Sequence, residues 1–127
     1  MDVLRRGNTV AHFSVRTLAG EMFSYATIWQ RQNLVLAVLS PSEPPGHYVT
    51  GLTDLAGELR DTQTTCVITR DPVRGLPAPA LLVADRWGEI VHIVTGVMTD
   101  DLPPPGDVLD WVHYVSHRCP ECEGEAK

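Results

Sequence analysis

The sequence predicts a single α/β domain with a mixed central sheet, flanking helices and an N-terminal β-hairpin. Its longest apolar run, residues 34–39, is entered from polar residues and closed by Ser-Pro-Ser, which is typical of a strand buried on both faces. An amphipathic segment, 48–60, follows, and a β-branched run, 64–69, comes next. A helix between two strands implies a parallel β-α-β unit with a right-handed crossover. A chain of 127 residues is long enough to bury one full core.

The elements before the central strand are short. Residues 12–15 alternate in polarity and predict a strand, and residues 22–24 predict its antiparallel partner after a turn at 17–21. Residues 25–30 predict one helical turn. The central strand itself is expected over 33–40.

The segment after the central strand predicts one helix over 48–60. Apolar residues recur there at helical spacing. These residues are Tyr48, Leu52, Leu55, Ala56 and Leu59. Gly51 and Gly57 interrupt the pattern, and each costs up to ~1 kcal/mol relative to alanine. We expect these glycines to permit close packing on the sheet.

A loop and a second hairpin complete the sheet. Residues 71–79 are rich in Pro and Gly and predict a loop between strands 64–69 and 80–84, which should flank the central strand on opposite sides. Nine residues reach about 30 Å, which suffices to cross two strand spacings, a distance of roughly 10 Å in total. The loop should then lie across the end of the central strand. Residues 85–88 predict a tight turn, and 89–95 its second strand.

The C-terminal part predicts a helix and a tail. Residues 96–106 contain three consecutive prolines and predict a stiff extended connector. Asp107 is a suitable cap for a helix over 108–118. We therefore divide the chain into a domain, 1–118, and an acidic C-terminal tail, 119–127, that carries a C-x-x-C motif.

Composition excludes several classes of partner. The formal charge of −6 and the scattered basic residues argue against a nucleic-acid surface. No run approaches the ~20 apolar residues of a membrane span. Residues 1–12 lack the apolar segment of a secretory signal. The sequence therefore predicts a cytoplasmic protein that binds neither nucleic acid nor membrane.

Three segments in this order carry a resemblance to a known group. Residues 7–21 read G-N-T-V-A-H-F-S-V-R-T-L-A-G-E, residues 33–40 form the strand before a turn, and residues 79–90 read P-A-L-L-V-A-D-R-W-G-E-I. Together they resemble the thioredoxin-like redoxin and peroxiredoxin-like group, which includes the alkyl hydroperoxide reductase and thiol-specific antioxidant proteins. The resemblance implies a thioredoxin-like fold, a thiol-disulfide or peroxide oxidoreductase activity, and a cis-proline at Pro79.

The turn that should carry the active-site cysteines departs from this group. Where such redoxins carry W-C-P-P-C, the present chain has Glu43 at the nucleophile position and Gly46 at the resolving position. Pro44 and Pro45 remain between them, and His47 follows. The attacking species in this chemistry is a thiolate, and a carboxylate cannot form a mixed disulfide. We therefore expect a degenerate turn, although a helix N-terminus there still suits an anion.

Any remaining thiol chemistry would use Cys119 and Cys122, which form a tentative redox pair. They follow a helix C-terminus, where the helix dipole raises the pKa of a thiol and disfavours a fast nucleophile. With His113 and His117 they also make H-x3-H-x-C-x2-C, a set of four zinc ligands. The helix turns Cys119 away from the histidines, so a metal is not favoured. Cys66 is interpreted as a small buried hydrophobe in a strand.

Three functions are consistent with these observations. The first is a redoxin or antioxidant oxidoreductase by descent, without a cofactor and with a small-molecule or protein thiol partner. The second is a non-catalytic binding module with a narrowed pocket near Glu43, His47, Ala78 and Pro79. The third is a zinc-binding protein that uses the C-terminal His/Cys set, and a homodimer is compatible with each of these hypotheses.

Overall fold

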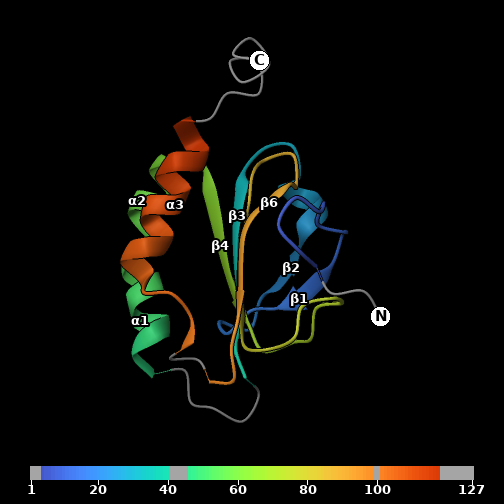
Figure 1. The fold of residues 1–127 in the computed structure, drawn as a ribbon, viewed down its shortest axis with the longest axis vertical. Helices are drawn as coiled ribbons and strands as arrows, with labels where there is room; N and C mark the ends of the chain where they lie inside the picture. The colour runs from blue at the N-terminus through green and yellow to red at the C-terminus, as the bar shows by residue number, and fades with distance from the viewer. Residues whose placement is uncertain (1–3, 41–45, 99–100, 118–127) are drawn as a thin grey trace.

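The protein folds into a central sheet with helices on one face and a small β-hairpin on the other (Figure 1). The computed structural model describes residues 4–40, 46–98 and 101–117, with the backbone alone described at 46–47 and 116–117. Its elements, in chain order, are β1 (Ser14–Arg16), β2 (Met22–Ser24), the 3-10 turn η1 (Tyr25–Thr27), β3 (Asn33–Val38), α1 (Gly46–Asp54), α2 (Ala56–Asp61), β4 (Thr64–Thr69), β5 (Ala80–Ala84), β6 (Ile90–Thr95) and α3 (Pro105–His117).

The four-stranded sheet has the order β4-β3-β5-β6. Strand β3 runs parallel to β4, with Val38 opposite Thr69, and antiparallel to β5, with Val38 opposite Ala80. Strand β6 returns antiparallel to β5. The predicted mixed α/β architecture with an N-terminal hairpin is confirmed, and so is the placement of β4 and β5 on either side of the central strand.

Strand β3 divides the core into two clusters. All six of its residues are buried, so successive side chains serve opposite faces of the sheet. Leu34 and Leu36 pack on the hairpin side, while Val35 and Ala37 pack under the helices. The interpretation of this run as a strand buried on both faces is correct.

The loop between β4 and β5 belongs to the hairpin side of the sheet. Val73 and Leu76 are buried in the same cluster as Val15 and Tyr25. The backbone carbonyl of Gly75 also accepts a 2.8 Å hydrogen bond from the N–H of residue 4. The loop therefore contributes to the core as well as crossing the sheet.

The single helix predicted over 48–60 is wrong, because the chain forms two helices that meet at Leu55. The first, α1, already begins at Gly46. Leu55 has φ −88° and ψ 0°, and its N–H bonds the carbonyl of Leu52, three residues back, at 3.1 Å. That short-range bond tightens the turn and ends α1, after which the N–H of Leu59 bonds the carbonyl of Leu55 and starts α2.

The prediction that Asp107 caps the last helix is also wrong. Helix α3 begins at Pro105, and the N–H groups of Asp107 and Val108 both bond the carbonyl of Pro104. Proline suits the first helical position because its missing N–H would have no partner there. Asp107 instead lies in the first turn, where a carboxylate interacts favourably with the helix dipole. None of the helices in the described ranges has the length and apolarity that a membrane crossing requires.

His92 of β6 joins the sheet to α3 by stacking on Trp111, with ring centroids 4.1 Å apart. The pKa of His92 is lowered below its ordinary value of 6.5. The larger cause is desolvation, and the smaller is the positive charge of Arg6. The fold therefore favours the neutral His92 ring. The contribution of this ring to the free energy of unfolding is complete above pH 6.5 and is lost as the pH falls. We expect an NMR titration of the His92 ring to give a pKa below 6.5, and a Trp111→Ala variant, in which the desolvating indole is absent, to return it toward that value. An unchanged pKa in this variant would show that the stack does not desolvate the imidazole.

Candidate functional site

Most of the residues predicted to form the active-site turn lie outside the described part of the chain. Glu43, Pro44 and Pro45 fall in the segment 41–45, which is not described, and Gly46 and His47 open α1 with their backbone alone described. The predicted redox pair, Cys119 and Cys122, is likewise outside the described residues. The degenerate turn and the redox pair therefore stay predictions.

Pro79 lies beside the end of the central strand. The peptide bond between Ala78 and Pro79 is cis. Pro79 is buried while Ala78 is exposed, and the following residue, Ala80, pairs with Val38 near the carboxyl end of β3. The carbonyl of Pro79 accepts a hydrogen bond of 3.1 Å from the N–H of Gly96. This bond brings the chain that follows β6 against the proline.

Two large apolar side chains follow Gly96 and face solvent. Val97 is 86% exposed and Met98 is 54% exposed. Their backbone N–H groups donate to one carboxylate oxygen of Asp101, Oδ2, at 2.9 and 3.0 Å. These bonds, from Met98 first and Val97 second, lower the pKa of Asp101. A Cβ at Gly96 would lie 2.5 Å from the Cβ of Asp101, so only glycine fits there.

The result is a fixed backbone that presents apolar side chains to water. We call the exposed Ala78, the adjoining Pro79, and the side chains of Val97 and Met98 the apolar rim. Because Asp101 already holds the backbone of these exposed apolar residues in place, a partner that binds them needs to order little further backbone. Two neighbouring exposed apolar side chains on a hydrogen-bonded backbone are a candidate contact surface.

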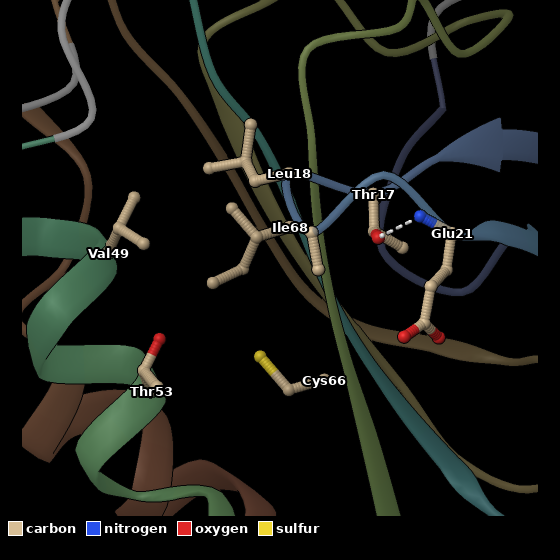
Figure 2. A pocket seen from close by; sticks show the side chains of 8 residues that line it. Thr17, Leu18, Glu21, Val49, Thr53, Cys66 and Ile68 are labelled. Atoms are coloured by element: carbon tan, nitrogen blue, oxygen red, sulfur yellow. Dashed lines mark hydrogen bonds between the residues drawn. The ribbon is translucent and has the colours of Figure 1, made fainter.

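A cavity of about 270 Å³ lies between α1, the hairpin turn and the edge strand β4. Figure 2 shows the sulfur of Cys66 pointing into the space between Val49 and Thr53 of α1 and Leu18 of the hairpin turn. Cys66 keeps part of its surface exposed, so the prediction of a simple buried hydrophobe is only partly correct. Thr17 closes the cavity on the hairpin side, where its hydroxyl accepts a 3.2 Å hydrogen bond from the N–H of Glu21.

The surroundings of Cys66 do not activate a thiol. Burial raises the pKa of the Cys66 thiol to about 12, so it carries little thiolate at neutral pH. Tyr48 interacts electrostatically with this thiol, since the pKa of Tyr48 is raised by burial and then by the Cys66 sulfur. The Tyr48 hydroxyl is buried, and no hydrogen-bond partner for it is found among the described residues. Among the described residues that line this cavity there is no Lys, Arg or His, the cationic side chains that make a cysteine nucleophilic.

The predicted zinc ligands are only partly described. His113 is exposed on α3, whereas the side chain of His117 and both C-terminal cysteines are outside the described atoms. Within the ranges 4–40, 46–98 and 101–117, no three His, Cys, Asp or Glu side chains gather closely enough to hold a metal ion. The zinc set remains a prediction.

Sequence reasoning missed the apolar rim almost entirely. The prolines of residues 96–106 predict an extended connector and give no sign of the bonds from Val97 and Met98 to Asp101. The available signal was the order of residue types, since an aspartate four residues after Val97 can accept hydrogen bonds from the preceding backbone and close a turn.

Comparisons with known proteins give the fold but no close relative. No protein-family model matches the chain, and no curated protein sequence matches it. Among solved structures, the mitochondrial 2-Cys peroxiredoxin of Plasmodium falciparum superposes with a TM-score of 0.69 at 8% identity, covering 89% of this chain and 95% of that one. Mycobacterium tuberculosis AhpC gives 0.66 at 8% identity, covering 94% and 98%.

A thioredoxin-family protein is similar to a comparable degree. The thiol:disulfide interchange protein of Chlorobium tepidum gives a TM-score of 0.64 at 13% identity, covering 90% of this chain and 99% of that one. At such low identities the likeness concerns the fold alone. This chain therefore has a thioredoxin-like fold, the architecture found in peroxiredoxins and in thioredoxin-family thiol-disulfide proteins.

Proposed function

We propose that this protein is a thiol-independent binding module on a thioredoxin-like fold, and that it holds an extended segment of a partner polypeptide at the apolar rim. The observation that supports this most is the double hydrogen bond to Asp101, which fixes Val97 and Met98 in an exposed position. Val97 and Met98 face solvent, and the N–H of Gly96, just before them, bonds the carbonyl of Pro79. An exposed apolar surface fits an elongated polymer better than a small molecule, which usually needs an enclosed pocket.

The cysteine distribution supports binding without thiol chemistry. The turn before α1 contains no cysteine. Cys66 is the sole cysteine in the described ranges, and its thiol is held in the neutral form by burial. An apolar rim can bind a partner in either redox state.

Binding to a cysteine-free unfolded polypeptide tests the proposal. We expect an array of cysteine-free 15-residue peptides with apolar side chains to bind the wild-type protein. A variant with Val97→Asp and Met98→Asp should bind at least tenfold more weakly, because it places two charges where apolar contact is required; tenfold corresponds to about 1.4 kcal/mol. The control is Tyr114→Asp, which places a charge at another exposed apolar side chain, 62% exposed, on α3.

Two results would count against the module. Equal loss of binding in the Tyr114→Asp control would mean that general surface hydrophobicity, rather than the rim, holds the peptides. Loss of binding after Cys119→Ser and Cys122→Ser substitution would mean that thiols are required.

The second candidate is thiol-disulfide or peroxide oxidoreductase activity through Cys119 and Cys122. It is supported by the C-P-E-C sequence together with the structural likeness to thiol-disulfide proteins and peroxiredoxins. Insulin-reduction and peroxide-consumption assays on the wild-type protein and on the Cys119→Ser, Cys122→Ser variant test it. Turnover that disappears in the variant supports this candidate, and turnover that is absent from both removes it.

Zinc is the alternative use of the same C-terminal residues. His113 and His117 lie four residues apart on α3, a spacing that puts two ligands on one helix face. Elemental analysis of the purified protein tests this hypothesis. Absence of stoichiometric zinc, also after incubation with zinc ions, eliminates it.

A further inference from the structure

Met98 is the one member of the apolar rim whose side chain is readily oxidised. The other three members, Ala78, Pro79 and Val97, carry only hydrocarbon. Met98 is 54% exposed, so solvent and small solutes reach its side chain. Hydrogen peroxide converts an accessible methionine to its sulfoxide, and dedicated reductases reverse the reaction. The rim therefore contains a group that responds chemically to peroxide.

This oxidation needs no activating group from the protein. A lone pair on the Met98 sulfur attacks one oxygen of hydrogen peroxide. The S–O bond forms while the O–O bond breaks, and the departing hydroxide takes up the proton of the transferred oxygen. The sulfur loses two electrons, and the peroxide is reduced to water. Hydrogen peroxide is the only co-reactant.

The thiol of Cys66 does not compete for the peroxide at neutral pH. A thiol reacts as its thiolate, and burial raises the pKa of Cys66 to about 12. A thioether has no proton to lose, so it needs no such ionisation. Within the ranges 4–40, 46–98 and 101–117, methionine is therefore the sulfur-containing side chain that is ready to react.

Met22 offers the same chemistry at a different place. It is 62% exposed and lies in β2, where it pairs with Arg16 of β1. The hairpin meets the β4 edge of the sheet through a bridge between Thr17 and Thr69, whereas Met98 follows β6 at the opposite edge. Met22 therefore provides a comparison within the same protein, because its oxidation leaves the apolar rim unchanged.

Oxidation of Met98 changes the surface of the rim and leaves its backbone in place. The N–H groups of Val97 and Met98 donate to Oδ2 of Asp101 at 2.9 and 3.0 Å, and neither bond involves the sulfur. The sulfoxide adds a hydrogen-bond acceptor to a surface from which a bound partner excludes water. Burial of such a polar group without a donor is unfavourable. The oxidised rim thus keeps its backbone conformation and loses its apolar character.

We propose that Met98 is a peroxide-sensitive modification site, and that its oxidation to the sulfoxide releases the partner polypeptide from the apolar rim. The release rests on the proposed function, whereas the reactivity of Met98 does not. Binding would then respond to an oxidant without the participation of any cysteine.

Peroxide treatment of the full-length protein tests the modification site directly. Sulfoxide formation at Met98 and at Met22 is followed over time by peptide mass spectrometry. We expect Met98 to be oxidised within a few-fold of the rate of a methionine in a short unstructured peptide. A rate slower by about tenfold or more would show that the fold shields the sulfur, and it would overturn the proposal.

Affinity for the cysteine-free peptides, before and after treatment, tests the release. Complete oxidation of Met98 should weaken binding by about fivefold or more, because the partner must desolvate the sulfoxide oxygen. Subsequent treatment with methionine sulfoxide reductases should restore the affinity. Unchanged affinity of the fully oxidised protein overturns this inference alone. Absence of peptide binding to the untreated protein instead refutes the proposed function, and the release with it.

Conservative variants assign the effect to one sulfur. Leucine replaces methionine with little change of volume and cannot be oxidised by peroxide. The affinity of Met98→Leu should be the same before and after treatment, whereas Met22→Leu should lose affinity on treatment as the wild type does. A peroxide response that persists in Met98→Leu overturns the proposal, because the oxidant then acts on another group.

Discussion

The free energy of unfolding is expected to fall steeply between pH 9 and pH 12. Burial raises the pKa of Cys66 from 9.0 to about 12, and burial with a contribution from Asp85 raises that of Tyr25 from 10.0 to about 12. The pKa of Tyr48 is raised in the same direction. Unfolded chains lose these protons near the ordinary values, whereas the folded protein keeps them. The unfolded state therefore binds fewer protons, and stability falls as the pH rises.

The size of this effect follows from proton linkage. Each proton retained by the fold contributes a slope of about 1.4 kcal/mol per pH unit. Two or three such groups amount to several kcal/mol by pH 12, which is comparable with the ~5–15 kcal/mol total stability of a typical domain. As the pH is raised, the protein should therefore unfold before its peptide backbone is chemically damaged.

Tyr25 provides the sharpest test of the effect. Its side chain is fully buried and stacked on Phe13, with ring centroids 5.5 Å apart. Its hydroxyl has no hydrogen-bond partner among the described residues. A Tyr25→Phe variant should therefore be at least as stable as the wild type at pH 7, because it removes a buried polar group without a partner.

Urea unfolding measured at half-unit steps from pH 8 to pH 11.5 checks both statements. We expect the alkaline slope of Tyr25→Phe to be shallower by up to about 1.4 kcal/mol per pH unit. The control is Tyr114→Phe, which makes the same chemical change at a side chain that is 62% exposed. Identical slopes in all three proteins would mean that Tyr25 ionises in the fold as it does in water.

Much of the fold could be predicted because strong local signals agreed with the tertiary structure. The apolar run of β3 marked the centre of the sheet, and the β-branched run of β4 kept its predicted bounds, Thr64–Thr69. The break at Leu55 could not be predicted, because the apolar spacing continues through the point where the N–H of Leu55 bonds the carbonyl of Leu52. The start of α3 at Pro105 was obscured by the run of prolines before it.

The candidate site was harder to predict than the fold. The family resemblance points to the turn before α1, and the cysteine pattern points to Cys119 and Cys122. The rim depends instead on Asp101, whose role becomes visible only when its carboxylate meets the backbone of Val97 and Met98. A polar side chain that organises a loop leaves little trace in hydrophobic periodicity, because its partners are backbone groups common to every residue.

Substitution of Gly51 by alanine is expected to destabilise the protein by roughly 1–3 kcal/mol, although alanine is the better helix former. A Cβ built at Gly51 would lie 2.7 Å from Cγ of Pro105. That atom belongs to a rigid ring at the first position of α3, so either α1 or α3 must move. The expectation that this glycine permits packing on the sheet is thereby corrected, since its close neighbour is the helix α3.

Gly57 gives the matched control, since a Cβ there would have nothing within 4 Å. It lies in α2, where Gly57→Ala should stabilise the protein by roughly 0.5–1 kcal/mol through helix propensity alone. The same chemical change should therefore have opposite signs at two positions six residues apart, as measured by urea or thermal unfolding at pH 7. If both variants prove more stable than the wild type, α1 and α3 are not in close contact at Pro105, and helix propensity alone decides both sites.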